Sequence, residues 1–236
     1  MPGSIRNRVA ILGMGCTRFG ERWDASDADL IVDAAYQAFN DAGIGPEEVQ
    51  AAWVGTSTGK TGMTISEPLR LQYIPVTRVE NACATASDAF RNACYAVAAG
   101  IYDMVLAIGV DKFKDSGISG LGDGGTPGPS HSMLAESTPP RSFAMLATTY
   151  FAKYGLTYDE GKHMIGRVSW KSHQNGMRNK NAHFQGNVTM DQIINAPMVS
   201  WPLGLFDCCG VSDGCAAAIV TTPEIAKARK KDPVFV

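Results

Sequence analysis

The chain has 236 residues, with 21 Lys and Arg against 23 Asp and Glu, for a formal charge of -2. Hydrophobic residues make up 45% and charged residues 19%, a balance typical of a globular protein with a core rather than of a disordered chain. The chain has no excess of Lys and Arg that could neutralise the phosphates of a nucleic acid. We therefore do not expect nucleic acid as a partner.

Membrane and secretory functions are not expected. The longest strongly apolar stretches, Ile101–Val110 and Ala216–Val220, fall short of the roughly 20 residues that cross a bilayer. The apolar run Val9–Leu12 is too short for the core of a secretory signal. We therefore expect no membrane partner and a cytoplasmic location.

The cysteines and histidines predict no metal site. The six Cys include no C-x-x-C pair and show no regular spacing, which argues against a disulfide framework or a zinc ribbon. The four His are too far apart to chelate from one helical turn, and none belongs to an H-E-x-x-H motif. We expect neither a metal nor a bound cofactor.

The first 110 residues alternate between strand and helix patterns. A helical pattern opens at Ser26, which can cap it, and ends at Gly43; a second covers Ala84–Ala99, which contains no Pro or Gly. Strands are predicted at Val9–Leu12, Ala51–Val54, Val76–Glu80 and Met104–Val110. This alternation predicts an α/β fold with a mostly parallel sheet covered on both faces.

The composition changes after the fourth strand. Between Asp115 and Pro140 the chain is rich in Gly, Pro and Ser, a long irregular excursion that at such length is usually functional. Helical patterns follow around Ala144–Tyr154 and Tyr158–Asn175, and Ala216–Thr221 returns to strand composition. We interpret the excursion and its helices as an insertion into the α/β domain.

Two glycine-rich segments resemble nucleotide-binding motifs and fail on detail. Gly13 and Gly15 follow a strand, but the third glycine of G-x-G-x-x-G would fall at Arg18, so we interpret them as turn glycines. Gly55–Thr61 has one residue too few between its glycines for a phosphate-binding loop. We predict a flexible loop over Gly55–Gly62.

Cys83 is the residue whose position indicates chemistry. It directly follows a predicted buried strand and stands at the first turn of the predicted helix, where unpaired N–H groups and the helix dipole favour an anion such as a thiolate. Small neighbours leave room for an acyl group. From position alone, a nucleophile and a structural cysteine remain equally open. Buried, unreactive roles are expected for Cys16, Cys94 and Cys215.

Three segments carry a resemblance to a known family. Val79–Ser87, with the sequence VENACATAS, resembles the nucleophilic-cysteine segment of thiolases. Gly100–Lys112 resembles the thiolase strand that ends in Gly-x-(Glu/Asp)-(Lys/Ser), and Asp207–Ala218 resembles the sterol-carrier-protein-x branch in particular. The resemblance covers nearly all of the chain.

The resemblance implies a fold. Thiolases consist of two similar βαβαβαββ halves, with a loop excursion inserted in the first, and this chain resembles the first half, layered α/β/α. We therefore expect a thiolase N-terminal domain over residues 1–115 and 201–236 and a loop domain over 116–200. A C-terminal thiolase domain is absent from this sequence.

The resemblance also implies site residues. Cys83 would accept the acyl group, and Phe143 and Met145 would line the acyl and pantetheine channel of a coenzyme A (CoA) ester. Ser212–Gly214 would form a structural turn, while Cys208 and Cys209 are interpreted as a packing pair although Cys208-Cys209-Gly210 fits C-x-G. Segments expected at a homodimer contact are Gly55–Tyr73 and Val76–Glu80.

The groups that complete a thiolase site are missing. A histidine base, an acid/base cysteine and an oxyanion segment belong to the second half of the family fold, and acylation and enolate formation each need a positioned proton acceptor. The prediction is therefore an acyl-CoA acyltransferase, cleaving or forming 3-ketoacyl-CoA in lipid metabolism, that is a fragment or a split chain. A separate C-terminal half would then be its partner.

Two alternatives stay open. The first is a retro-aldolase acting on the side chain of a steroid or aromatic CoA ester, with a small OB-fold, zinc-ribbon protein as partner. The second is a non-catalytic subunit that binds acyl-CoA or serves assembly. Retention of Cys83 at the helix start favours an enzyme, because a scaffold has no chemical reason to keep it.

Overall fold

A computed structural model describes residues 4–115, 138–230 and 232–236, which form two compact units. Unit 1 comprises Met1–Ser116 and Asp213–Val236, and unit 2 comprises Gly117–Ser212. Most of the predicted Gly- and Pro-rich excursion lies outside the described residues. Each unit is described by itself below.

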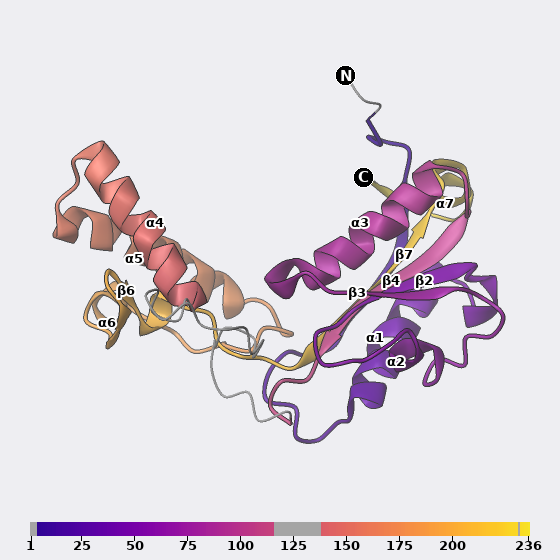
Figure 1. Ribbon diagram of the computed structural model, residues 1–236, viewed down its shortest axis with the longest axis horizontal. Coiled ribbons are helices and arrows are strands. Elements are labelled where there is room, and N and C mark those ends of the chain that lie inside the picture. The colour runs from indigo at the N-terminus through magenta and orange to yellow at the C-terminus, as the bar shows by residue number, and fades with distance from the viewer. Residues whose placement is uncertain (1–3, 116–137, 231) are drawn as a thin grey trace, which may run out of the picture. The chain divides into compact units, whose positions relative to one another are not determined.

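Unit 1 has the predicted α/β fold, built on a six-stranded sheet in the order β3-β2-β4-β7-β1-β8 (Figure 1). Along the chain the elements alternate as βαβαβαββ, with unit 2 inserted between β4 and β7, and α7 and β8 follow. Their bounds are β1 Ala10–Cys16, α1 Asp27–Ala42, β2 Ala51–Gly55, α2 Met63–Ser66, β3 Val76–Val79, α3 Thr85–Ala98, β4 Met104–Asp111, β7 Gly214–Thr221, α7 Pro223–Arg229 and β8 Val234–Phe235.

The sheet is mixed, which corrects the prediction of a mostly parallel one. β3, β2 and β4 are parallel neighbours, whereas β7 runs antiparallel to both β4 and β1, and β1 antiparallel to β8. Parallel neighbours need crossover connections, which α2 and α3 supply between β2, β3 and β4, whereas β7 enters the sheet after the inserted unit. The parallel part is therefore confined to the strands around the α3 connection.

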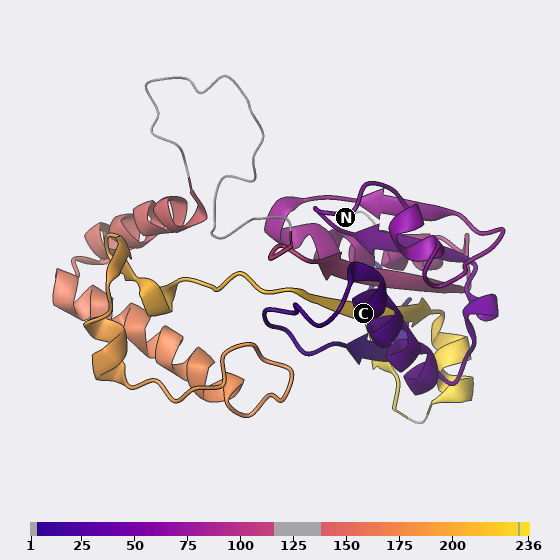
Figure 2. The ribbon, with the colours of Figure 1, turned by 90° about the horizontal axis from the view of Figure 1, so that it is seen from below.

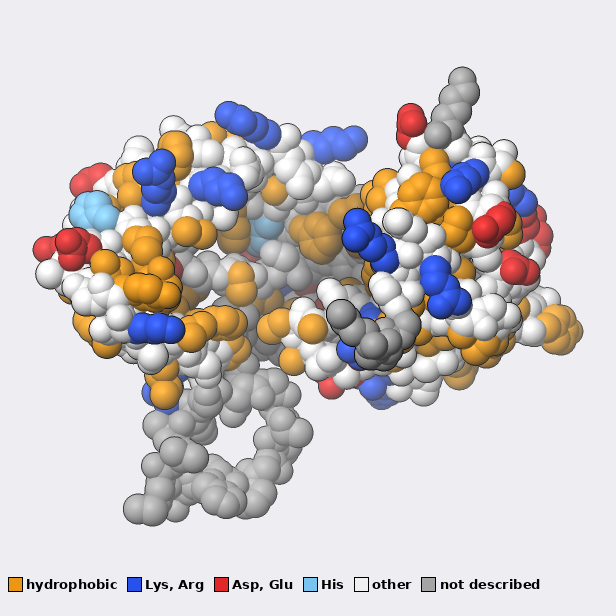
Figure 3. Space-filling model, turned by 90° about the horizontal axis from the view of Figure 1, so that it is seen from above, with side chains coloured by type: hydrophobic (Ala, Val, Ile, Leu, Met, Phe, Trp, Pro, Cys, Tyr) orange, Lys and Arg blue, Asp and Glu red, His pale blue; other side chains and the backbone are white. Residues whose placement is uncertain are grey.

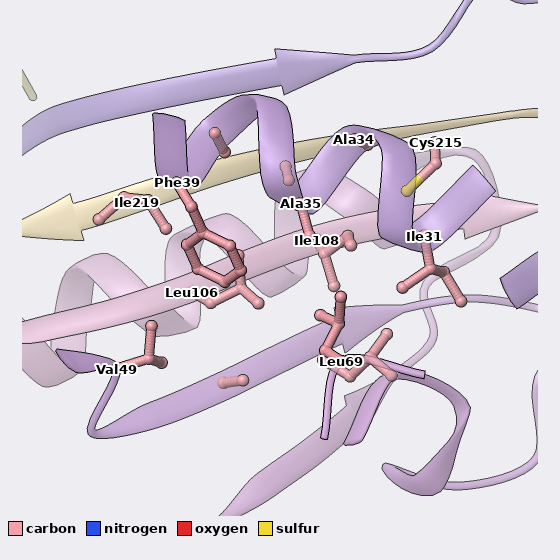
Figure 4. Packing of buried hydrophobic residues seen from close by; sticks show 14 of the residues in the cluster. Ile31, Ala34, Ala35, Phe39, Val49, Leu69, Leu106, Ile108, Cys215 and Ile219 are labelled. Atoms are coloured by element: carbon pink, nitrogen blue, oxygen red, sulfur yellow. The ribbon is translucent and has the colours of Figure 1, made fainter. Parts of the chain in front are cut away.

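Helices cover both faces of the sheet (Figures 1 and 2). Ser26 caps α1 in a capping box with Asp29, and Gly43 ends the helix with a φ of 68°. Phe39 and Ile31 of α1 pack against Leu106 of β4 and Ile219 of β7 (Figure 4). The opposite face packs against α3, giving three layers, α/β/α.

Gly13 and Gly15 lie inside β1, so their interpretation as turn glycines is wrong. α1 crosses this strand so closely that a Cβ at Gly13 would overlap the backbone of Ala38, and one at Gly15 the backbone of Ala34. The glycines permit close helix–strand packing without ending the strand. A sequence pattern in which glycine is taken to end a strand does not predict this packing.

Unit 2 contains α4 Pro139–Tyr154, α5 Tyr158–Gly176, α6 Met190–Ile194 and a small hairpin of β5 Met198–Ser200 and β6 Leu203–Gly204. α4 begins five residues before the predicted Ala144, because prolines fit the first turn of a helix, where no N–H partner is required. Over residues 138–212, the buried apolar side chains besides Pro202 are those of Ala144, Phe151, Val188, Ile193 and Leu203.

A buried ion pair lies among the described residues of unit 2. The Lys162 ammonium on α5 bonds the Asp207 carboxylate, with side chains 2% and 1% exposed. Asp207 also accepts hydrogen bonds from the Ser169 hydroxyl at 2.7 Å and the Gly204 N–H at 2.8 Å. With its lone pairs satisfied, this carboxylate links α5 to the segment after β6.

Candidate active site

The candidate site lies where three parallel strands end. β2, β3 and β4 run in the same direction and end at Gly55, Val79 and Asp111, at one edge of the sheet. The chain leaves β3 and enters α3 through the short 3-10 turn Ala82–Ala84, which contains Cys83. In parallel sheets this edge is where ligands bind.

Two glycines set how closely α3 approaches the sheet. Gly55 and Gly109 are register partners on β2 and β4. A Cβ at Gly55 would overlap Thr85 and Ala86, and one at Gly109 would overlap the Ala86 side chain. The first turn of α3 therefore rests on the ends of these strands, and Cys83 lies just beyond them.

Cys83 is exposed, and the turn that carries it is held by its neighbours. Ala82 has a positive φ of 45°, and its N–H donates to Glu80 Oε1 at 2.7 Å. The Thr85 hydroxyl accepts from the Asn81 N–H at 2.8 Å and donates to the Ala82 carbonyl at 2.6 Å. No side chain caps the N-terminus of α3, and the N–H of Thr85, its first residue, donates to the Ala82 carbonyl.

Asp111 organises the loop after β2. Its Oδ1 accepts from the N–H groups of Ser57 and Thr58, at 2.9 and 3.0 Å, and from the hydroxyls of Thr56, Ser57 and Thr58. The predicted loop is present, and these hydrogen bonds hold its Thr56–Thr58 part. The corresponding signal in the sequence is the acidic position of the Gly-x-(Glu/Asp)-(Lys/Ser) strand end.

The other cysteines differ from Cys83 in environment. Burial raises the pKa of the Cys94 thiol to about 11 and also raises the pKa of Cys215, as expected for unreactive core residues. Cys16 is only half-buried. Cys209 is exposed and Cys208 half-buried, which corrects their interpretation as a packing pair.

Phe143 and Met145 lie on α4 of unit 2, 64% and 66% exposed. Positions i and i+2 of a helix point to different sides, so the two side chains do not share a face of α4. Phe143 shares its face with Leu146 and Tyr150, which are also exposed. That either residue meets Cys83 at one site remains a prediction.

His183 and Asp213 are two further polar side chains with close partners. His183 Nδ1 lies 2.7 Å from the Ser212 hydroxyl, and its ring stacks on Phe184. Asp213, which is fully buried, accepts from the N–H groups of Arg22 and Lys114 at 3.0 and 3.1 Å. Asp213 therefore holds three segments of unit 1 together before β7.

Among residues 4–115, 138–230 and 232–236, no cluster of His, Cys, Asp and Glu could hold a metal ion. Within the same ranges, no helix has the length and apolar character needed to span a membrane.

The family model described as the thiolase N-terminal domain matches residues 9–224. This chain belongs to the thiolase N-terminal domain family. The match confirms the resemblance read from VENACATAS and the strand ends, and the βαβαβαββ order agrees with it.

Known relatives of this thiolase domain are longer than the chain. An acetyl-CoA acetyltransferase of Methanocaldococcus jannaschii is 38% identical over 97% of the chain and 59% of the relative. Sterol carrier protein 2 of Gallus gallus is 30% identical over 97% of the chain and 44% of the relative. The chain thus spans about 60% or less of the length of these relatives.

A solved structure titled "Ltp2-ChsH2(DUF35) aldolase" superposes with a TM-score of 0.82 at 28% identity. It is matched over 99% of this chain and 60% of its own length. The thiolase domain is therefore similar both to acetyltransferases and to a protein with an aldolase title.

Proposed function

We propose that this chain is the first half of a thiolase-type acyl-CoA acyltransferase in which Cys83 forms the acyl-enzyme. The Cys83 sulfur attacks the thioester carbonyl, a Cys83 S–C bond forms, and CoA leaves as its thiolate, which takes up a proton. The observation that carries this proposal is the exposed thiol beside an uncapped helix N-terminus at the ends of β2, β3 and β4. Those N–H groups would stabilise the developing oxyanion.

A second half would supply the histidine base and the acid/base cysteine, either in a longer chain or as a separate polypeptide. The surface of unit 2 supports this part of the proposal, because fifteen large apolar side chains among its described residues are exposed. Apolar side chains gather on this surface in Figure 3. A surface so rich in apolar side chains marks a contact with another protein body. The domain division at 115/116 and 200/201, with the C-terminal domain missing, is part of the same proposal.

Charge on unit 2 supports an acyl-CoA substrate. Between Glu160 and Asp191 the chain carries no acidic residue, whereas Arg167, Lys171 and Arg178 are exposed there. Cations of this kind pair with phosphate oxygens, and CoA carries several phosphates. The exposed Phe143 face of α4 would contact the acyl or pantetheine part, and Met145 would contribute from the other side.

The test is the intact mass of the purified protein before and after incubation with acetyl-CoA or a longer acyl-CoA, with the natural second half present. We expect one acyl group per chain, retained in Cys209→Ala, which removes an equally exposed thiol, and absent in Cys83→Ala. An acyl adduct that survives Cys83→Ala would contradict the proposal.

The second candidate is an aldolase acting on a CoA-ester side chain, with a small OB-fold, zinc-ribbon protein as partner. It is favoured by the similarity to the structure with the aldolase title. Such a reaction needs no acyl-cysteine, so carbon–carbon cleavage that persists in Cys83→Ala would support it. A protein that binds acyl-CoA without either reaction would instead be a binding or assembly subunit.

We also propose a homodimer formed through β3. This strand is at one end of the sheet order and pairs only with β2 among the described strands, which leaves a row of backbone groups for a second copy. A cytoplasmic location is part of the proposal, and six free cysteines agree with a reducing compartment.

A further inference from the structure

The backbone just before Cys83 adopts an uncommon conformation. Ala82 has a φ of 45°, a left-handed conformation that a residue with a Cβ seldom adopts, and Asn81 has φ -154° and ψ 52°. Such conformations persist only where the surroundings over-determine them, and they concentrate at functional sites. The interactions that hold this turn are therefore of functional interest.

The Thr85 hydroxyl is the centre of these interactions. It is 5% exposed, and it bonds both the Asn81 N–H and the Ala82 carbonyl, one bond on each side of the peptide that joins the two residues. Glu80 adds a bond to the Ala82 N–H at 2.7 Å. Together these bonds fix the turn that presents Cys83.

Three threonines at other helix starts act differently from Thr85, whereas Thr138, before α4, makes no capping bond. Thr157, Thr189 and Thr222 each accept a hydrogen bond from the N–H three residues later, and so cap α5, α6 and α7. Thr85 bonds backward to the turn instead, and no side chain caps α3. The hydroxyl therefore holds the turn before α3 and does not cap the helix.

Both ends of the turn are anchored to the sheet. Ala86 rests on Gly55 and Gly109 at the start of α3. At the end of β3, the Arg78 guanidinium donates twice to the Thr56 carbonyl, at 2.8 and 3.1 Å. Because the flanks are fixed, losing the Thr85 bonds would change chiefly the few residues that carry Cys83.

We infer that Thr85 is a positioning residue for Cys83: its hydroxyl holds Asn81–Ala82 in the left-handed turn that presents the thiol at the N-terminal end of α3. This inference rests on the proposed role of Cys83. Valine has nearly the same shape but lacks the hydroxyl, and serine keeps it.

The experiment measures the rate at which iodoacetamide alkylates Cys83 in the full chain, between about pH 6 and about pH 9, by peptide mass spectrometry. Cys209, equally exposed, is the internal reference. We expect Thr85→Val to slow Cys83 about tenfold and to move its pH profile, and Thr85→Ser to stay within about twofold, with Cys209 unchanged.

A normal Cys83 rate in Thr85→Val, or an equal loss in Thr85→Ser, would overturn the inference. Labelling of buried Cys94 in Thr85→Val would reveal unfolding. In that case the Cys83 alkylation rate of the Ala82→Gly/Thr85→Val variant tests the inference. Glycine adopts the turn without help, so Cys83 reactivity should return to within about threefold of that of Ala82→Gly alone. A larger loss would overturn the inference. Alkylation needs no acyl-CoA, so absence of an acyl-enzyme in the wild type would contradict only the proposed function.

Discussion

Unit 1 and unit 2 differ in how far their apolar side chains are buried. In unit 1, α1 and α3 enclose the two faces of the sheet with residues such as Phe39, Ile108 and Val220, which are at most 1% exposed. In unit 2, α4 leaves Phe143 and Leu146 each 64% exposed, and the centre is held by an ion pair.

Unit 1 therefore packs its apolar side chains against one another, whereas unit 2 leaves many of them open to contact. Large exposed apolar patches mark interaction surfaces in globular proteins. Unit 1 carries Cys83, the proposed nucleophile, on a scaffold with a closed core, while unit 2 exposes apolar and cationic side chains. The predictions below test this contrast, starting with the largest expected effect.

Removal of a core side chain tests whether unit 1 is closed. Phe39→Ala should lower the free energy of unfolding by about 4 kcal/mol, because it leaves a cavity between α1 and the sheet. Urea unfolding followed by circular dichroism measures this loss. Tyr36→Ala, on the exposed side of the same helix, should cost about 1 kcal/mol through its edge contact with Phe39. Equal losses would contradict a closed core.

Breaking the buried ion pair tests how unit 2 is held. Lys162→Met leaves the Asp207 carboxylate buried without its cation and should destabilise unit 2 by about 3 kcal/mol. Proteolysis in unit 2, measured against urea concentration, reports this. The Lys162→Met/Asp207→Asn variant should regain most of the loss, because no charge is left buried and the amide oxygen can still accept from Ser169 and Gly204. A double variant as unstable as the single one would show that the pair itself is required.

Substitution on the exposed face of α4 tests its role in contact. Leu146→Ser should change the unfolding free energy of the isolated chain by less than about 0.5 kcal/mol, because the side chain is largely in water, and should weaken assembly with a second half about tenfold. Phe151→Ala, buried on the same helix, should cost about 3 kcal/mol. Calorimetry measures the unfolding free energies, and titration with the second half measures the strength of assembly. A large loss in isolated Leu146→Ser would mean that the chain itself covers this face.

The smallest effect concerns a surface pair of unit 1. The Lys230 ammonium hydrogen-bonds Asp41 and lowers the pKa of that carboxyl. A lowered carboxyl pKa adds stability above the unfolded value of about 3.9, and this stability is lost as pH falls through the folded value. Lys230→Ala should therefore lower the free energy of unfolding by less than about 1 kcal/mol at neutral pH. In acid, where the carboxyl is protonated, this cost should disappear. Thermal melts at both pH values provide the measurement, and an undiminished difference in acid would assign the effect to the Leu12 carbonyl that Lys230 also bonds.

The sequence by itself determined the α/β alternation and the family. The Ser26 cap, the Gly43 end and the uninterrupted run Ala84–Ala99 are local signals, so α1 and α3 could be placed without knowing their neighbours. VENACATAS pointed to a thiolase and placed Cys83 at the start of a helix, and the family match and the structure agree.

Only the tertiary structure decided the features that depend on distant residues. Gly13 and Gly15 stay within a strand because α1 crosses it, and the loop Thr56–Thr58 is ordered because Asp111, more than fifty residues later, accepts its hydrogen bonds. The antiparallel course of β7 follows from its entry after unit 2. Local patterns report what a residue prefers, whereas contacts between distant segments appear only when packing brings those segments together.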